Sequence, residues 1–157
     1  MNLELLKEKF PNGILELGVD KGQNYVKVNL AQLHDVVKFC KEENSFNLNV
    51  LMDIVAVDYH TQEARFELIY IIYSIPLRHR LRLKVRVKDG ESVPTCSDIY
   101  KSADWAEREI FDMFGIQFNK HPNLKRILMF EGFEGHPLRK DYPTKRRQKI
   151  PVMKEVP

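Results

Sequence analysis

Three carboxylates close together in one segment are the first candidates for chemistry in this sequence of 157 residues. Glu107, Glu109 and Asp112 lie within the run Glu107–Ile116, and paired carboxylates commonly serve as general acid and base. If the segment is a helix, Glu107 and Glu109 lie about 200° apart around its axis and cannot reach the same substrate atom. We therefore expect these carboxylates to form a charged helix face or an interface, not a catalytic pair.

Histidine and cysteine, the other common ligands and nucleophiles, do not cluster in the sequence. His121 and His136 each precede a proline, and we expect them to hydrogen-bond at turns, since a metal or a proton relay needs neighbouring ligands. Cys40 and Cys96 are far apart, and an iron–sulfur cluster normally takes about four ligands. The sequence therefore predicts no metal and no cofactor in this chain. The five histidines, none spaced as a metal-ligand pair on one helix, are His34, His60, His79, His121 and His136.

Sequence motifs of the common enzyme classes are missing as well. The chain has no GxGxxG or GxxxxGK[ST] loop that would hold phosphates. It has no GxSxG or HExxH segment that would supply a nucleophile or bind zinc. An isolated hydrolase or metalloenzyme would need a convergent polar pocket or a bound metal, and we expect the isolated chain to be non-catalytic.

A row of cations alternates with apolar residues between His79 and Lys88. Successive side chains of a strand point to opposite faces, so one face is expected to be apolar and the other cationic. Such a face either binds nucleic acid or an acidic protein, or is a solvated sheet face paired with acids such as Glu67. Aromatic side chains for base stacking are missing from this row, which weakens the RNA interpretation. The cations are Arg80, Arg82, Lys84, Arg86 and Lys88.

Hydrophobic periodicity predicts the elements that must position these side chains. The expected fold class is α+β: a single domain with a mostly antiparallel or mixed β-sheet, covered by helices mainly on one face. The expected helices are residues 1–10, 30–40 with Asn29 as N-cap, and 103–114 ended by Gly115. The expected strands are residues 14–19, 25–30, 50–57, 66–75 and 79–88, the last three as an antiparallel meander, with 116–118 at a sheet edge.

Arg108 lies at the centre of the last expected helix. Asp104 and Asp112 are each four residues away from it, which places both on the same helix face as the arginine. We expect the two aspartates to hold Arg108 from both sides, each exposed pair contributing about 0.3–0.5 kcal/mol. The pairing would orient Arg108 more than it would stabilise the fold.

The net charge of +3 is unevenly distributed along the chain. Residues 1–135 hold 18 Lys and Arg against 20 Asp and Glu, a net charge of −2, whereas residues 136–157 hold 7 against 2, a net charge of +5. The second segment contains four prolines and too few apolar residues to build a core. We therefore predict a domain over residues 1–135 and an extended basic arm over 136–157. The arm is either disordered alone or laid over another surface, and its charge favours an acidic one.

The chain offers no obvious membrane segment. Its longest strongly apolar stretch, residues 66–75, is interrupted by Glu67 and is shorter than the roughly 20 residues of a membrane-spanning helix. The first ten residues lack the apolar run of a signal peptide. We therefore expect a soluble, intracellular chain.

Several segments resemble the signatures of one known family. The run Glu107–Ile116, followed by His121–Met129, closely resembles the signature of the 30 kDa subunit family of the proton-pumping NADH-quinone oxidoreductase, respiratory complex I. Residues 135–143 resemble the second signature of this family. Lys125 stands where the family commonly has arginine, and lysine offers a point charge instead of a planar fork. Further segments that resemble the family in the expected order are residues 56–59, 65–67 and 80–85.

The resemblance implies a structural and assembly subunit of the peripheral arm, which supports electron transfer from NADH to quinone without a catalytic residue of its own. FMN and iron–sulfur clusters are then expected in partner subunits. The chain is expected to pack against the hydrogenase-like subunit that helps to form the quinone site, and against neighbouring iron–sulfur subunits. No nucleic-acid partner is expected. Contact with the cytoplasmic side of the inner membrane is expected to be indirect, through the complex.

Two alternatives to this assignment stay open. One is the equivalent subunit of a related membrane-bound hydrogenase or of an F420H2- or ferredoxin-linked oxidoreductase, and a more remote one is a basic nucleic-acid-binding module. Under the main hypothesis the charged residues of both signatures form the subunit interface, because arginine and tyrosine bury large areas and retain directed hydrogen bonds. The interface candidates are Glu107, Arg108, Glu109, Asp112, His121, Arg126, His136, Arg139, Lys140, Asp141 and Tyr142.

Overall fold

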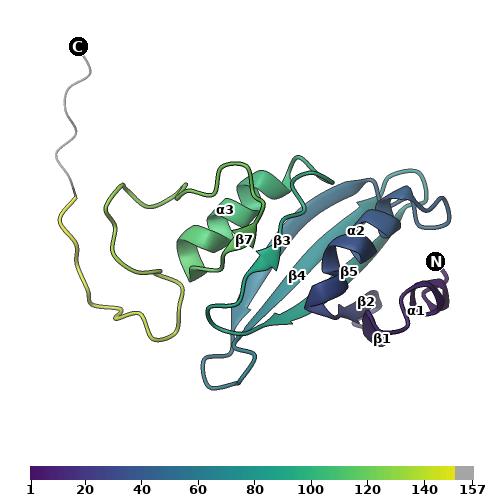
Figure 1. The fold of residues 1–157 in the computed structure, drawn as a ribbon, viewed down its shortest axis with the longest axis horizontal. Coiled ribbons are helices and arrows are strands. Elements are labelled where there is room, and N and C mark those ends of the chain that lie inside the picture. Colours follow the sequence, from purple (N-terminus) through teal and green to yellow (C-terminus); the bar gives the residue numbers. More distant parts are fainter. Residues whose placement is uncertain (151–157) are drawn as a thin grey trace, which may run out of the picture.

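The computed structural model describes residues 1–150, and its helices and strands lie between residues 4 and 119 (Figure 1). From residue 120 to 150 the described chain runs through turns and bends. The elements in chain order are α1 (Glu4–Lys9), β1 (Ile14–Asp20), β2 (Gln23–Val28), η1 (Leu30–Gln32), α2 (Leu33–Glu42), β3 (Val50–Asp58), β4 (Phe66–Ser74), β5 (His79–Val87), β6 (Val93–Pro94), α3 (Ala103–Phe114) and β7 (Phe118–Asn119).

Five strands form one sheet in the order β1-β2-β5-β4-β3. The pairs β1–β2, β3–β4 and β4–β5 are antiparallel, because each pair is joined by a short connection that turns the chain back. In contrast, β2 and β5 run parallel, which is possible because η1, α2, β3 and β4 lie between them along the chain. The sheet is therefore mixed, with antiparallel pairs in the majority.

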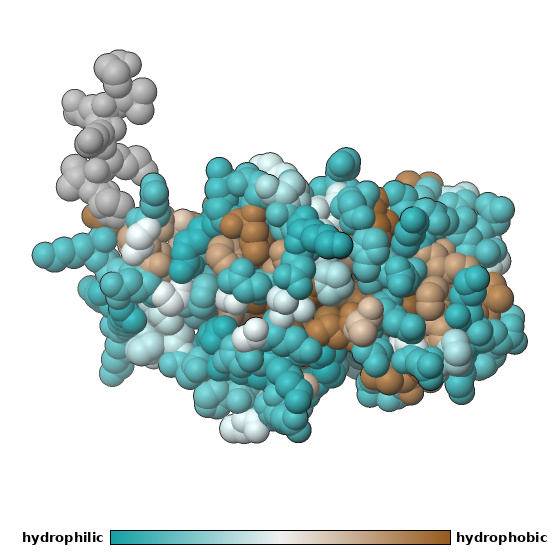
Figure 2. Space-filling model, in the orientation of Figure 1, coloured by the Kyte–Doolittle hydropathy of each residue, from teal (hydrophilic) through white to brown (hydrophobic). Residues whose placement is uncertain are grey.

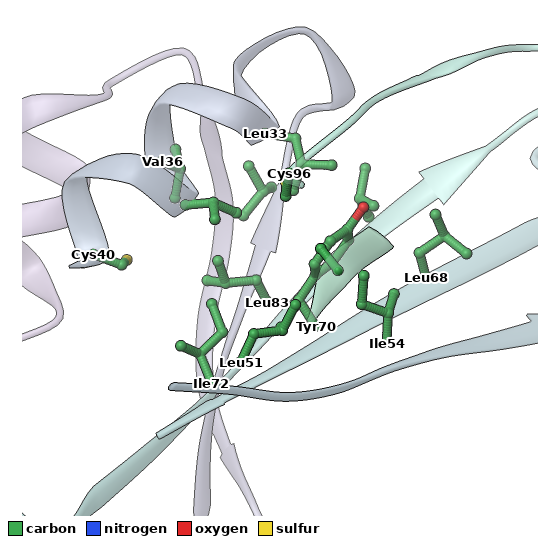
Figure 3. Close-up of a cluster of buried hydrophobic side chains, with 14 of the residues drawn as sticks. Leu33, Val36, Cys40, Leu51, Ile54, Leu68, Tyr70, Ile72, Leu83 and Cys96 are labelled. Carbon is green, nitrogen blue, oxygen red and sulfur yellow. The ribbon is translucent and has the colours of Figure 1, made fainter. Parts of the chain in front are cut away.

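The apolar core lies between this sheet and the helices (Figure 3). Leu68, Tyr70 and Ile72 of β4 project into it at every second position and are fully buried, as strand geometry requires. Leu33 and Val36 reach the same core from α2. Each fully buried aliphatic side chain contributes about 1.5–3 kcal/mol, so this layer supplies much of the stability of the fold.

Both α2 and α3 cover one face of the sheet and lie in front of it in Figure 1. The register confirms the alternation expected for β5: Leu81 and Leu83 are buried on the helix-covered face, whereas Arg82 and Lys84 lie on the other. The predicted α+β class, with a mixed sheet and helices mainly on one face, is confirmed.

The ends of several elements differ in detail from the expected ones. Asn29 accepts a hydrogen bond from the Ala31 N–H, but the turn that it caps is the 3-10 helix η1, and α2 begins three residues later. The expected edge strand forms at Phe118–Asn119 and pairs with β6 in a separate two-stranded parallel sheet. At the end of α3, Gly115 adopts a φ of +76°, the left-handed conformation that stops a helix at the predicted residue.

Candidate functional site

All eleven interface candidates lie on α3 or in the chain that follows it. Residues 121–142 pass alongside α3, and hydrogen bonds connect them to the helix at several points. The structure therefore brings together candidates that are as far apart in sequence as Asp112 and His136. Among residues 1–150, no group of three or more His, Cys, Asp or Glu side chains has a geometry that could hold a metal ion.

The centre of this region is the carboxylate of Asp112, which is buried. Arg126 Nη1 donates to its Oδ1 at 2.6 Å, and the backbone N–H groups of Ile127, Leu128 and Met129 donate to its Oδ2 at 3.0, 2.8 and 2.8 Å. Burial acts to raise the pKa of this carboxyl, but the N–H donors and Arg126 outweigh it, and the pKa lies below its ordinary value. Asp112 thus holds the loop after residue 125 against α3 as an anion.

Glu107, one turn earlier on α3, is also fully buried. Thr95 Oγ1 donates to its Oε2 at 2.5 Å, and the Cys96 N–H donates to its Oε1 at 2.7 Å. Burial is the main influence and raises the pKa of Glu107 to about 7, although these two hydrogen bonds act in the opposite direction. This carboxyl therefore ties α3 to the segment after β6 and is the buried acid whose charge changes near neutral pH.

His121 packs beside Glu107 with a side chain that has no solvent exposure. Its Nδ1 accepts the Asn123 N–H at 3.1 Å, and its Nε2 lies 3.2 Å from the Asp104 carbonyl oxygen and 3.9 Å from Glu107 Oε2. These partners assign the proton to Nε2, which is the neutral form of the ring. The expectation that His121 hydrogen-bonds at a turn agrees with this geometry.

Two expectations about α3 are wrong. Glu107 and Asp112 do not lie on a charged helix face, because both carboxylates are buried and bonded within the chain, whereas Glu109 is exposed. That these carboxylates take part in a subunit interface stays a prediction. Arg108 is not held by the flanking aspartates: its Nε and Nη2 donate to the backbone oxygens of Lys125 and Arg126 at 3.1 and 3.2 Å. The physical reason at Asp112 is that its carboxylate is already engaged by Arg126 and by three backbone N–H groups of the loop.

A second buried centre, around Arg65, was not predicted from the sequence. Arg65 makes a two-point contact with Asp58, in which Nε lies 2.9 Å from Oδ1 and Nη2 lies 2.9 Å from Oδ2. It also reaches Asp141 at 2.8 and 3.1 Å and Asp89 at 3.0 Å. The hydrogen bonds from Arg65 hold the pKa of Asp58 far below its usual range. The only sequence signal was that residues 56–59 and 65–67 resemble family segments, because the three aspartates come from distant parts of the chain.

Residues 136–142, which we call the C-terminal strap, are fastened to the domain through both centres. The Lys140 N–H donates to Asp58 Oδ2 at 2.8 Å, and Arg139 binds the Phe114 carbonyl oxygen at 2.5 Å and Asp89 at 3.0 Å. His136 Nδ1 lies 2.9 Å from the Asp112 carbonyl oxygen. Arg139 and His136 thus reach carbonyl oxygens at the C-terminal end of α3, where the free carbonyl groups of the helix need partners.

The C-terminal strap is the first part of the predicted arm, residues 136–157. Its residues 136–142 lie on the chain's own domain, and Tyr142 stacks on Phe133 with ring centroids 6.1 Å apart. Gln148 donates to the Tyr142 hydroxyl at 2.9 Å, so the contacts extend beyond the strap as far as Gln148. The division of the chain after residue 135 stays a prediction, and the last part of the arm, residues 151–157, lies outside the described residues.

A cavity of about 550 Å³ lies between α2 and the β6–β7 pair. None of the interface candidates lines it. Its wall includes His34, whose Nε2 lies 2.9 Å from Asp98 Oδ2. The lining residues are Ala31, His34, Asp35, Pro94, Thr95, Asp98, Asn119 and Lys120.

None of the helices in residues 1–150 is long and apolar enough to cross a membrane.

Two solved structures share this architecture and define the class of protein. The trypsin-resistant fragment (1–134) of Nqo5 matches with a TM-score of 0.66 at 29% identity, over 79% of this chain and 100% of that chain. A chain of the membrane-bound sulfane sulfur reductase (MBS), an archaeal respiratory membrane complex, matches with a TM-score of 0.77 at 26% identity, over 91% of this chain and 84% of that chain. The class is that of subunits of multi-subunit respiratory complexes.

Sequence comparison narrows the class to one family. A relative from Geobacter sulfurreducens, named as a subunit of NADH-quinone oxidoreductase, is 48% identical over 140 residues, 88% of this chain and 85% of the relative. One of the same name from Trichlorobacter lovleyi is 46% identical over 143 residues, 90% of this chain and 87% of the relative. The chain belongs to the family of the respiratory-chain NADH dehydrogenase 30 kDa subunit, whose model matches residues 26–148. The resemblance seen in the sequence is therefore confirmed.

Proposed function

We propose that this chain is a structural and assembly subunit of an NADH-quinone oxidoreductase and performs no catalytic step itself. It packs against the hydrogenase-like subunit at the quinone site and against neighbouring iron–sulfur subunits. FMN and the iron–sulfur clusters then belong to those partners. The chain reaches the cytoplasmic side of the inner membrane through the complex.

The observation that carries the proposal is a set of three exposed apolar side chains on or next to α3, which we call the apolar row. Trp105, Leu128 and Leu138 are 66%, 57% and 53% exposed, and all three lie on or next to α3. Figure 2, which views the molecule from the helix side, shows apolar side chains gathered in patches among polar ones. Large exposed apolar side chains, tryptophan above all, are typical of protein interfaces.

The buried polar groups hold the residues of this row in position. They do not contact the partner themselves. The Leu128 N–H is held by Asp112, and the Leu138 N–H donates to the Met113 carbonyl oxygen at 3.1 Å. Trp105 lies under the guanidinium of Arg108, whose carbon is 5.9 Å from the ring centroid. A surface that is already ordered loses less conformational entropy when a partner binds. In this arrangement most of the eleven candidates position the interface, and the apolar side chains contact the partner.

Charge substitutions in the apolar row test the proposal. Trp105→Asp and Leu128→Asp place a charge in the contact and should reduce the amount of chain that copurifies with the native complex by about tenfold or more. Leu15→Asp is the matched control, because Leu15 is 65% exposed on β1, at the opposite edge of the sheet from β3 and α3. Copurification of all three variants at the level of the unchanged chain contradicts the proposed role of this row.

A second candidate function is the equivalent subunit of another respiratory complex. The match to a chain of the sulfane sulfur reductase covers 91% of this chain, so the same scaffold serves a different electron acceptor. The relatives named for the NADH enzyme are more similar in sequence, at 40–48% identity. Identification of the subunits that copurify decides between the two, since a flavin- and NADH-binding subunit among them would identify the NADH enzyme.

A further inference from the structure

The face of the sheet opposite α2 and α3, which we call the open face, has an unusual composition on its β3–β4 side. Its register pairs Val55 with Ile69 and Val57 with Glu67, and Ile71 lies beside them on β4. All of the aliphatic members are partly exposed, and Val55 is 37% exposed. The solvent face of an antiparallel sheet is normally polar. A strip of valine and isoleucine at the edge of the sheet is therefore a surface of the kind that another protein segment commonly covers.

A row of cations lies directly beside this aliphatic strip. The register of β4 and β5 places Arg82 opposite Ile71, Lys84 opposite Ile69 and Arg86 opposite Glu67. Arg82 is paired with Asp20 at 3.4 Å. Within residues 1–150, Lys84 and Arg86 have no carboxylate within 4.0 Å. The open face thus combines an apolar strip with a parallel line of cations, two of which, Lys84 and Arg86, have no salt-bridge partner within residues 1–150.

Aromatic rings hold these two cations in place. Lys84 Nζ lies 4.6 Å from the ring centroid of Tyr25, and the guanidinium carbon of Arg86 lies 4.2 Å from that of Tyr59. Such contacts contribute about 0.5–1 kcal/mol at exposed sites and limit the freedom of long side chains. The charges therefore stand at defined positions on the face.

We infer that the open face binds an acidic, amphipathic segment of another subunit of the complex. The apolar side of that segment lies on the strip of Val55, Ile69 and Ile71, and its carboxylates lie over Lys84 and Arg86. Complementary charge favours this occupant, because a basic or neutral segment would leave Lys84 and Arg86 without a carboxylate partner. The inference rests on the proposed function, since the partner is a subunit of the same complex, but it concerns the sheet face that is opposite α3.

Cysteine labelling tests whether the face is covered. The native thiols give a low background, because Cys40 and Cys96 are buried and burial raises the pKa of Cys40 to about 12. Lys84→Cys places a thiol on the open face, and Lys38→Cys places a matched thiol on the exposed side of α2. The rate of maleimide labelling is measured for the purified chain and for the native complex extracted in mild detergent.

The expected result is that the thiol at position 84 reacts about tenfold or more slowly in the complex than in the purified chain, because an interface core excludes water. The thiol at position 38 should change by less than about threefold. An unchanged rate at position 84 in a complex that retains the chain overturns the inference and leaves the proposed function standing. If the unaltered chain does not copurify with any subunit, the proposed function itself fails.

The chemistry of the occupant is tested separately by zero-length carbodiimide coupling, which joins an amine to a carboxylate that touches it. The expected product links Lys84 to an Asp or Glu of another subunit, and Lys84→Arg removes this product while it keeps the charge. The double variant Lys84→Glu, Arg86→Glu should weaken retention in the complex by about tenfold, which corresponds to about 1.4 kcal/mol. A protected position 84 without any such product shows an occupant that is not acidic and overturns the assignment.

Discussion

The buried carboxyl of Glu107 gives the sharpest prediction, which is a pH dependence of stability. Burial raises its pKa from the ordinary 4.5 to about 7. A tenfold change in proton affinity corresponds to about 1.4 kcal/mol. The raised pKa of Glu107 therefore changes the free energy of unfolding by about 3 kcal/mol at most between low and high pH. Because the folded pKa is the higher one, this contribution is fully present below pH 4.5 and is lost as the pH rises through 7.

Other titratable groups change the stability in the opposite direction as the pH rises. Their effects must be separated from that of Glu107. Burial lowers the pKa of His136, so its contribution is present above its unfolded pKa and is lost as the pH falls. The depressed pKa values of Asp58 and Asp112 likewise give stability that is lost only as the pH falls below the ordinary range of aspartate. The comparison of Glu107→Gln with the unchanged chain cancels these groups, since both proteins contain them.

The assay is urea unfolding followed by circular dichroism at pH values between about 4.5 and 8. Near pH 4.5 the glutamine variant should have nearly the same free energy of unfolding as the unchanged chain, because the protonated carboxyl and the amide are similar in size and polarity. Near pH 8 the variant should be more stable, by up to about 3 kcal/mol. Glu109→Gln is the control, because Glu109 is exposed on the same helix. A difference between Glu107→Gln and the unchanged chain that does not vary with pH refutes the reasoning.

Three further substitutions test the buried centres and the helix end. Asp112→Asn removes the charge that faces Arg126 and should lower the free energy of unfolding by about 3 kcal/mol, measured by urea titration at pH 7; a loss below about 1 kcal/mol would contradict a buried pair. Arg65→Lys keeps a charge but loses the two-point contact, and proteolysis between residues 136 and 142 should become faster; an unchanged cleavage pattern argues against the strap. Gly115→Ala adds a Cβ within 2.5 Å of the His136 ring at positive φ and should reduce the melting temperature, whereas no change would be inconsistent with the observed packing.

Much of the fold could be predicted because it follows from local pattern. The alternation of residues 79–88 and the helical period of residues 103–114 each depend on which side chains face the core, and both elements appear as expected. The parallel pairing of β2 with β5 was not predicted. Several elements lie between these two strands, and pairing between distant strands has no local signal.

The site was only partly predictable, for a similar reason. Glu107 lies four residues after Ala103 and three before Ile110, so helical spacing alone places it on the buried face, and that signal could have been used. Asp112 offers no such signal, because its donors come from a loop about fifteen residues later in the chain. The Arg65 centre combines three aspartates from separate segments, an arrangement that only the folded chain brings together.

The most direct test of the central claim is complementation in the host of this chain. Membranes of cells that lack it should contain little assembled complex and little NADH-to-quinone turnover. The unchanged chain should restore both, and Trp105→Asp should restore neither while it folds normally in isolation. Assembled complex with full turnover in the absence of the chain would contradict its role as an assembly subunit.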